Sequence, residues 1–559
     1  MFWGNEGLSK CKRLKDPIYG YISIPLNYMV DIVDTATFQR LRRIIQTSYA
    51  PLYSSAVHNR FVHSLGVYHL GTIAAQTLEG EIKKYIPEVD SKQLDRMIEI
   101  FLLACLLHDV GHAPFSHTGE KLYLDGEGEY RYVKLHKTLK KTVDSASFEK
   151  DIPTNANVSA APHEIMSAIV GINAFSKYMT TPEDRELFAR CITGYQYSEK
   201  TKSAAVKNCF ISLLNSKVID VDKLDYLIRD AYTTGFNTVN IDYERLLRAL
   251  TVLDTGSEIS LAYYKDAVSV LENVVYAHDA EKKWIQNHPI VLYECYILNH
   301  VFQGLSDCLD TSKHKLFSYE SLTPEGHTLK RKVKISLLCD DDIIYLMKNV
   351  FPSEISKEYF QRCNRRHPVW KSEAEYEALF SGALGGPNDS IKEFEYAMNA
   401  TASYLLSASD TWVINDDTMK KLSDELSLLD SKNLDELSKS IQEKDKRAAL
   451  NLMNCLLDFA DGHGCAHDFV IIEASQFNSG FSKPDFSKTK LIFSSSENEI
   501  VPSDFGTVAK PLQSNHPERK KFYYLFYRRK EGSADIDKVE LCKYLVSKFA
   551  TLNTFKRGD

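Results

Sequence analysis

The sequence predicts a mainly α fold, in which a helical core is followed by a smaller α+β C-terminal lobe. From about residue 30 to about residue 310, apolar residues recur at intervals of three and four, the period of amphipathic helices. After Leu329, short apolar and aromatic runs bounded by charged residues are typical of strands. We therefore expect a core domain over residues 1–328 and a C-terminal lobe over residues 329–559.

The individual elements follow from the same patterns in chain order. Helices are expected over residues 34–46, 95–111 and 221–232, where apolar residues lie at helical spacing. Strands are expected over residues 331–338, 468–477, 488–496 and 522–529, which are rich in β-branched and aromatic residues. The highly charged stretch 417–447 predicts an exposed helix, and we assign it to a helical insertion at about 372–450.

Length, composition and charge exclude several classes of protein. The chain has 559 residues, of which 44% are apolar and 26% charged, as in globular proteins of two or three domains. Its longest apolar run, Ile100–Leu107, is far shorter than the roughly 20 residues of a membrane-spanning helix. The N-terminus has no apolar stretch typical of a secretory signal, so a cytoplasmic location is expected. A net charge of -7 makes nucleic acid an improbable main substrate.

The chemically most informative segment is LLACLLHDVGHAPFSH at residues 102–117. An apolar helix ends there at His108 and Asp109, and His112 and His117 follow within one short loop. An imidazole next to a carboxylate at the end of a buried helix can bind a divalent ion, since neither group is easily buried alone. A structural His–Asp pair without a metal is the alternative reading of this segment.

Two more segments supply similar groups. The sequence HNRFVHSLGVYHLG places Arg60 and His63 at the start of one helix, and DVDKLDYLIRD places Asp222 and further carboxylates on a later one. Two imidazoles and two carboxylates from three helices would leave coordination positions open for water and a phosphate oxygen. An ion bound in this way is suited to the hydrolysis of phosphate esters.

Taken together and in this order, these segments and the later PHE at residues 162–164 resemble the HD-domain phosphohydrolases. More narrowly, they resemble the dGTPase-like deoxynucleoside triphosphate (dNTP) triphosphohydrolases. Some members of that family also carry a sterile-alpha-motif, which we do not expect in this chain. The resemblance implies an HD-domain helical core and a divalent metal, which could be Mg, Mn, Fe or Zn.

The resemblance also implies roles for individual residues. Four would be metal ligands, namely His63, His108, Asp109 and Asp222. Four would form the catalytic phosphate site, namely His112, His117, Glu120 and His163, with His117 as proton donor and Glu120 orienting it. The substrate contacts would be Gln46, Arg60, Lys223, Tyr226, Asp230, His278 and Gln286. At His278 and Gln286 this chain replaces an Arg and a sugar-stacking Tyr of the family, which leaves its sugar and base preference open.

A second nucleotide site is implied upstream. The segments DPIYGYISI and DTATFQRLRRIIQ match the opening motif of nucleotide-activated members, in which Asp34, Gln39 and Arg42 would read a guanine base. Arg528 would contact a phosphate from the C-terminal lobe, which we expect to be regulatory and to support a homo-oligomer, either a dimer or a tetramer. The alternative is a surface helix on which Asp34 and Arg42 form an exposed pair.

The expected function is therefore metal-dependent hydrolysis of dNTPs to a deoxynucleoside and inorganic triphosphate, activated by a nucleotide. Two alternatives remain open. One is an HD phosphohydrolase acting on another nucleotide, such as a monophosphate or an alarmone. The other is a nucleotide-responsive regulatory module with vestigial catalysis, which the replacements at His278 and Gln286 favour. Pool balance and antiviral defence would use the same site.

Overall fold

The structure is a computed structural model. It describes residues 11–555, apart from segments 124–130, 153–159, 218, 237–239, 257, 310–315, 330–331, 363–364, 382–388, 408–409, 430–435, 464–467, 475–488, 494–501, 505–521 and 529–534. The contacts divide the chain into two compact units. The first contains the described residues of Met1–Lys282, Leu309–Tyr345 and Asn478–Pro517, and the second those of Lys283–Cys308, Leu346–Phe477 and Glu518–Asp559. The division at residue 328 stays a prediction about domains.

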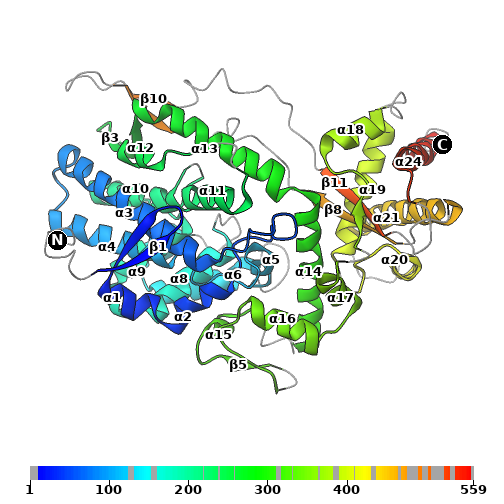
Figure 1. Ribbon diagram of the computed structural model, residues 1–559, viewed down its shortest axis with the longest axis horizontal. Helices are drawn as coiled ribbons and strands as arrows, with labels where there is room; N and C mark the ends of the chain where they lie inside the picture. The colour runs from blue at the N-terminus through cyan, green and yellow to red at the C-terminus, as the bar shows by residue number, and fades with distance from the viewer. Residues whose placement is uncertain are drawn as a thin grey trace. The chain divides into compact units, whose positions relative to one another are not determined.

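Helices make up most of the first unit (Figure 1). In chain order these are α1 (Leu26–Tyr28), α2 (Ala36–Gln39), α3 (Arg60–Tyr85), α4 (Ser91–Leu107), α5 (His117–Glu120), α6 (Arg131–Val143), α7 (Ala146–Asp151), α8 (Pro162–Ala174), α9 (Pro182–Thr193), α10 (Lys202–Leu214), α11 (Val221–Thr234), α12 (Tyr243–Arg248), α13 (Val268–Glu281), α15 (Tyr319–Leu322) and the start of α16 (Asp340–Asn349). The prediction of a mainly α fold is confirmed.

Three of these helices determine the position of the candidate site. Asn59 caps the start of α3 by accepting the amide of Val62, and Asp220 caps α11 by accepting the amide of Lys223. The last turns of α4 are buried on all sides, so this helix runs through the core and ends next to α3 and α8. The start of α3, the end of α4 and the start of α11 can therefore meet.

The helix predicted over residues 34–46 is shorter in the structure. α2 is followed by a single 3₁₀ turn over Arg40–Arg43, and the chain becomes extended at Ile44. The reason is a tertiary pairing, since Gln46 donates to the carbonyl of His58 and Arg60 donates to the carbonyl of Ile44. Residues 44–46 therefore lie beside the start of α3.

Small sheets complete the first unit. A hairpin is formed by β1 (Cys11–Asp16) and β2 (Gly20–Pro25), and a two-stranded sheet by β5 (His327–Thr328) and β6 (Lys334–Ile335). A four-stranded sheet has the order β10-β9-β4-β3, from β3 (Leu250–Asp254), β4 (Ile259–Tyr264), β9 (Lys490–Ile492) and β10 (Pro502–Asp504). β3 and β4 lie in the half expected to be helical, and the parallel pairing of β4 with β9 brings a late segment back to the first unit.

The second unit is α+β. Its helices are α14 (Pro289–Leu309), the end of α16, α17 (Glu354–Phe360), α18 (Glu373–Ser381), α19 (Asp389–Leu405), α20 (Asp416–Ser427), α21 (Glu436–His463) and α24 (Lys538–Phe555). Its sheet has the order β7-β11-β8, from β7 (His367–Pro368), β8 (Asp468–Ala474) and β11 (Phe522–Arg528). Phe394, Met398 and Leu422 are buried, so the helices assigned to an exposed insertion contribute to the core of this unit.

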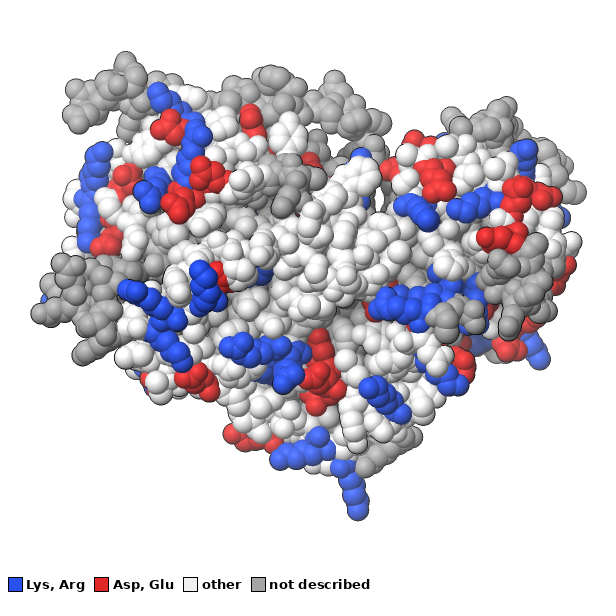
Figure 2. Space-filling model, viewed as in Figure 1, with Lys and Arg blue, Asp and Glu red and all other residues white. Residues whose placement is uncertain are grey.

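The surface shows no strong charge asymmetry on the face seen in Figure 2, where Lys and Arg side chains are interspersed with Asp and Glu among the described residues. None of the described helices combines the length and the apolar character needed to cross a bilayer.

Candidate metal centre

The four residues predicted to bind a metal converge on one point in the first unit. His63 lies in the first turn of α3, His108 and Asp109 follow the last turn of α4, and Asp222 lies in the first turn of α11. His63 Nε2 lies 3.2 Å from His108 Nε2, 3.0 Å from an Asp222 oxygen and 3.6 Å from an Asp109 oxygen. His108 Nε2 lies 3.6 Å from Asp109 and 3.7 Å from Asp222.

The hydrogen bonds at Nδ1 of the two imidazoles determine whether their Nε2 atoms can act as metal ligands. His63 Nδ1 lies 2.7 Å from an Asp225 oxygen, and His108 Nδ1 lies 3.0 Å from the carbonyl of Cys105. Both acceptors require an N–H at Nδ1, so in the neutral rings both Nε2 atoms carry lone pairs. Two lone pairs and two carboxylates therefore face one another, and a divalent cation fits such a donor set.

The electrostatics of the cluster also favour a cation. Burial raises the pKa of Asp109, but the charges of Arg60, His108 and His63 outweigh burial and hold it well below its usual range. Burial likewise opposes the ionisation of Asp222, and hydrogen bonds from His108 and His63 keep its pKa low. Burial lowers the pKa of His63, whereas the bonds to Asp222 and Asp225 raise it to about 10.

Asp225 is a residue beside the predicted ligands to which the sequence analysis gave no role. It is fully buried, accepts two bonds from Arg229 and one from the hydroxyl of Tyr19, and contacts His63. A Cβ on Gly66 would lie 1.8 Å from an Asp225 oxygen, so only glycine lets α11 approach α3 this closely. The signal in the sequence is the spacing of three between Asp222 and Asp225, which places the second carboxylate one helical turn behind the first.

Asp225→Asn is expected to lower metal affinity by roughly 10- to 100-fold, because an amide orients His63 less strongly than a carboxylate does. Metal titration of the metal-free protein measures this change, and the fold should persist because Asn keeps an acceptor for Arg229. Asp254→Asn, on β3 away from the cluster, is the control. An unchanged affinity in the Asp225 variant would contradict the orienting role.

A second group of imidazoles lies beside the first. His112, His117 and His163 bring ring nitrogens within 4.8 Å of one another. Glu120 accepts from Nδ1 of His117 at 3.0 Å and also from Nδ1 of His163. His112 lies 3.8 Å from Asp109 and stacks on His163 with ring centroids 4.2 Å apart. The predicted catalytic residues are thus adjacent to the predicted metal ligands.

The members of this second group differ in exposure and charge. Burial lowers the pKa of His163, but Glu120 outweighs burial and raises it to about 9, whereas burial and the charge of Arg60 lower the pKa of His112. Among the described residues, neither ring nitrogen of His112 has a hydrogen-bond partner. His117 is 64% exposed. A protonated His163 and an unpaired His112 suit an anionic oxygen ligand, and an exposed His117 can exchange protons.

Several predicted substrate contacts surround these groups. Arg60 is buried and donates to Asp109, to the hydroxyl of Ser116 and to the carbonyl of Gln46. The Oε1 atom of Gln46 is buried and lacks a partner within the described part of the chain. Lys223 donates to Asp220 and to the carbonyl of Ser216.

Tyr226 and Asp230 lie further along α11, on the helix that carries Asp222. Asp222 and Asp230 contribute to raising the pKa of Tyr226, although burial is the main cause. Asp230 lies 2.7 Å from Nε2 of His58, a residue without a predicted role. The predicted substrate contact Asp230 is therefore already paired with a buried imidazole.

The other predicted residues have contacts of their own. His278 contacts Asp279 on its own helix, α13, and Gln286 belongs to the second unit. Arg528, also in the second unit, donates two bonds to Asp468.

The residues predicted to read a guanine base lie close to one another. Gln39 accepts from Arg42 at 2.8 Å, Arg42 lies over the ring of Phe61, and Asp34 is exposed nearby. The sequence alternative, a pair between Arg42 and Asp34, is thus replaced by a pair between Arg42 and Gln39.

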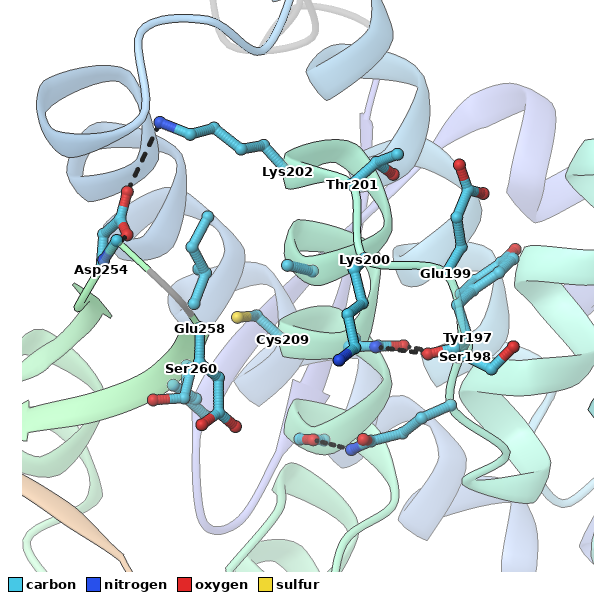
Figure 3. A pocket seen from close by; sticks show the side chains of 17 residues that line it. Tyr197, Ser198, Glu199, Lys200, Thr201, Lys202, Cys209, Asp254, Glu258 and Ser260 are labelled. Atoms are coloured by element: carbon cyan, nitrogen blue, oxygen red, sulfur yellow. Dashed lines mark hydrogen bonds and ion pairs between the residues drawn. The ribbon is translucent and has the colours of Figure 1, made fainter.

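A separate pocket of about 510 Å³ lies between the start of α10 and the β3–β4 hairpin (Figure 3). Lys202 spans its rim and pairs with Asp254 at 3.5 Å. The described residues that line it include none of the predicted site residues.

Comparisons with known proteins agree with this geometry. The family model of the HD domain matches residues 60–190. The uncharacterized protein YwfO of Bacillus subtilis is 32% identical over 258 residues, 45% of this chain and 46% of that protein. The deoxynucleoside triphosphate triphosphohydrolase SAMHD1 of Gallus gallus is 30% identical over 318 residues, 55% of this chain and 48% of that protein. The chain thus spans about half the length of the curated relatives it matches.

A crystal structure of a hypothetical protein from Aquifex aeolicus shares the fold. Its TM-score is 0.51 at 16% identity, and the match covers 96% of this chain and 99% of that one. The model match at residues 60–190 begins at Arg60 on α3 and includes three of the four converging ligands. Residues 60–190 therefore match the HD domain, and the chain is similar to relatives that include a deoxynucleoside triphosphate triphosphohydrolase.

Proposed function

We propose that this chain is a metal-dependent dNTP triphosphohydrolase, which releases a deoxynucleoside and inorganic triphosphate. The HD domain and the relatives support a metal-dependent phosphohydrolase in general. The observation that carries the narrower proposal is the position of three imidazoles directly beside the four metal-ligating groups. A triphosphate has about four negative charges and a poor leaving group, and these two clusters meet both demands.

His63, His108, Asp109 and Asp222 would hold the ion, which supplies Lewis-acid chemistry at a phosphate oxygen and a nucleophile from water. Its identity, among Mg, Mn, Fe and Zn, is part of the proposal to be tested. His112 and protonated His163 would bind phosphate oxygens. Arg60 would hold Asp109 in place and contribute its charge, since its three described bonds fix the guanidinium beside that carboxylate.

His117 would donate the proton to the departing 5′ oxygen. Its Nδ1 donates to Glu120, so the proton to be transferred would come from Nε2 of the doubly protonated ring. Gln46, Tyr226 and Asp230 would contact the sugar, with His58 holding one carboxylate oxygen of Asp230. Lys223, His278 and Gln286 remain proposed substrate contacts.

The proposal is tested by incubating the purified chain with each dNTP alone and in pairs, in the presence of Mg²⁺, Mn²⁺ or Fe²⁺. Deoxynucleoside and intact triphosphate should appear in equal amounts. Release of a monophosphate with pyrophosphate, or hydrolysis of an alarmone instead, would support a different HD phosphohydrolase. Absence of turnover with every nucleotide would favour a regulatory module.

We also propose that activity depends on a second nucleotide at a site built in part from Asp34, Gln39 and Arg42, and that this nucleotide promotes homo-oligomer formation. Arg528 would contribute a phosphate contact. Linkage requires such an activator to bind the assembled state more tightly.

Arg42→Ala should therefore weaken activation about 5- to 150-fold, the usual range of a coupling free energy, while metal content stays unchanged. Arg43→Ala is the matched control, because Arg43 is an exposed neighbour whose ion pair is with Asp341. Turnover with paired nucleotides and light scattering after size exclusion measure activation and assembly. An Arg42 variant that behaves like the Arg43 variant would contradict the activator site.

A further inference from the structure

The loop between Asp109 and His117 is held in an unfavourable backbone conformation. Phe115 and Ser116 both have φ of 55°, in the left-handed region that residues other than glycine rarely adopt. Two consecutive residues of this kind persist only where the surrounding structure holds them. The loop carries His112 and His117, so whatever holds it also sets the positions of these side chains.

Asp340 is one of the groups that hold it. This residue starts α16, more than 200 positions further along the chain, and it is 8% exposed. One of its carboxylate oxygens accepts the amide of Phe115 at 2.7 Å, and the other accepts the amide of Ile45 at 2.8 Å. A single carboxylate thus joins the histidine loop to the extended segment that leads to Gln46.

Arg40 holds the same loop through its carbonyls. It is 4% exposed and donates to the carbonyl of Val110 at 2.8 Å, to that of His112 at 2.9 Å and to that of Leu338 at 2.8 Å. These three bonds need the fork of a guanidinium, which the single ammonium of Lys does not offer. Arg40 therefore joins Leu338 to the histidine loop, and Asp340 joins that loop to the segment at Ile45.

We infer that Arg40 and Asp340 are positioning residues, which fix the loop so that His112 and His117 meet the substrate in reactive geometry. Neither side chain needs to touch the substrate. The inference rests on the proposed function for its kinetic consequences, but not for its structural ones. It assigns a catalytic contribution to residues 338–340, which lie outside the four motifs of the HD-domain resemblance.

The first test compares Asp340→Asn and Asp340→Ala with Asp341→Asn. Asn keeps one acceptor and Ala keeps none, whereas Asp341 is exposed and contacts only Arg43 among the described ion pairs. We expect kcat to decrease from the wild type to Asp340→Asn and again to Asp340→Ala, by about 10²-fold in total. A catalytic side chain misplaced by about 1 Å can have that effect. KM should change by less than about threefold and metal content should be unchanged, as expected for a loss of alignment.

Arg40→Lys is compared with Arg43→Lys in the same assays. The Arg40 variant should lose kcat with KM and metal content retained, and the Arg43 variant should behave like wild type. A decrease in kcat accompanied by an equal loss of metal, or a lowered melting temperature without any change in kcat, would show a merely structural role and overturn the inference.

Hydrogen exchange gives a test that does not require activity. The amide of Phe115 donates to Asp340, so amides of residues 112–118 should exchange faster in Asp340→Ala, which keeps no acceptor, than in Asp341→Ala. Unchanged exchange would overturn the inference even if the wild type hydrolyses dNTPs. Faster exchange with no wild-type turnover would support the loop contact and contradict only the proposed function.

Discussion

Asp222→Ala is expected to abolish hydrolysis and to lower bound metal, with the helical fold retained. Asp222 lies 3.0 Å from His63 Nε2 on a separate helix, so its loss removes one of the four groups proposed to hold the ion and leaves the helices that carry the other three in place. A correctly held ion contributes several kcal/mol of transition-state stabilisation, so turnover should fall by roughly 10³-fold or more. Metal analysis, turnover and circular dichroism on the same preparation measure the three quantities.

The double variant His108→Ala with Asp109→Ala should have the same effect. Asp341→Ala, an exposed carboxylate of the same unit, is the matched control. Retained turnover together with lost metal would show that the four residues do not form the reactive centre.

His117→Ala is expected to lower kcat by roughly 10²- to 10⁴-fold without changing metal content. This range is usual for a proton donor positioned by a partner, and Glu120 holds His117 at 3.0 Å. The metal-ligating groups do not include His117, so the ion should stay bound. Steady-state kinetics and metal analysis distinguish the two effects.

His463→Ala is the matched control for this variant, because His463 also forms an exposed pair with a glutamate, Glu540, at 3.1 Å. It lies on α21 in the second unit. If His117→Ala loses its metal, the residue belongs to the coordination shell and a different group must donate the proton.

The fold class could be read from periodicity, because long amphipathic helices such as α4 leave a regular apolar pattern. Shorter elements could not be recognised from the sequence pattern. β3 and β4 are too brief to outweigh the helical patterns around them, and their partner β9 comes from residues 490–492. The helix over residues 34–46 was overestimated because its end depends on a pairing with His58 and Arg60. Such non-local contacts leave no local signal.

The candidate site also contains residues that were predicted from the sequence and residues that were not. The resemblance of the motifs to the HD-domain phosphohydrolases implied that His63, His108, Asp109 and Asp222 would meet. The physical argument is that adjacent ligands at the end of a buried helix have few satisfactory partners other than one another or a cation. The residues that hold the predicted site residues in place were not predicted. Asp225 supports His63, and His58 holds Asp230, through contacts between residues more than 150 positions apart.

What the sequence by itself determined is the chemistry of the groups, since residue type decides which atoms can hold a metal, bind a phosphate or move a proton. What only the tertiary structure decided is their placement. Arg60, whose predicted partner was the substrate, is bound to Asp109, and Asp340, which had no predicted role, holds the histidine loop. The reason is physical: a buried charge must find its partner in space, and the partner's position in the chain does not constrain it.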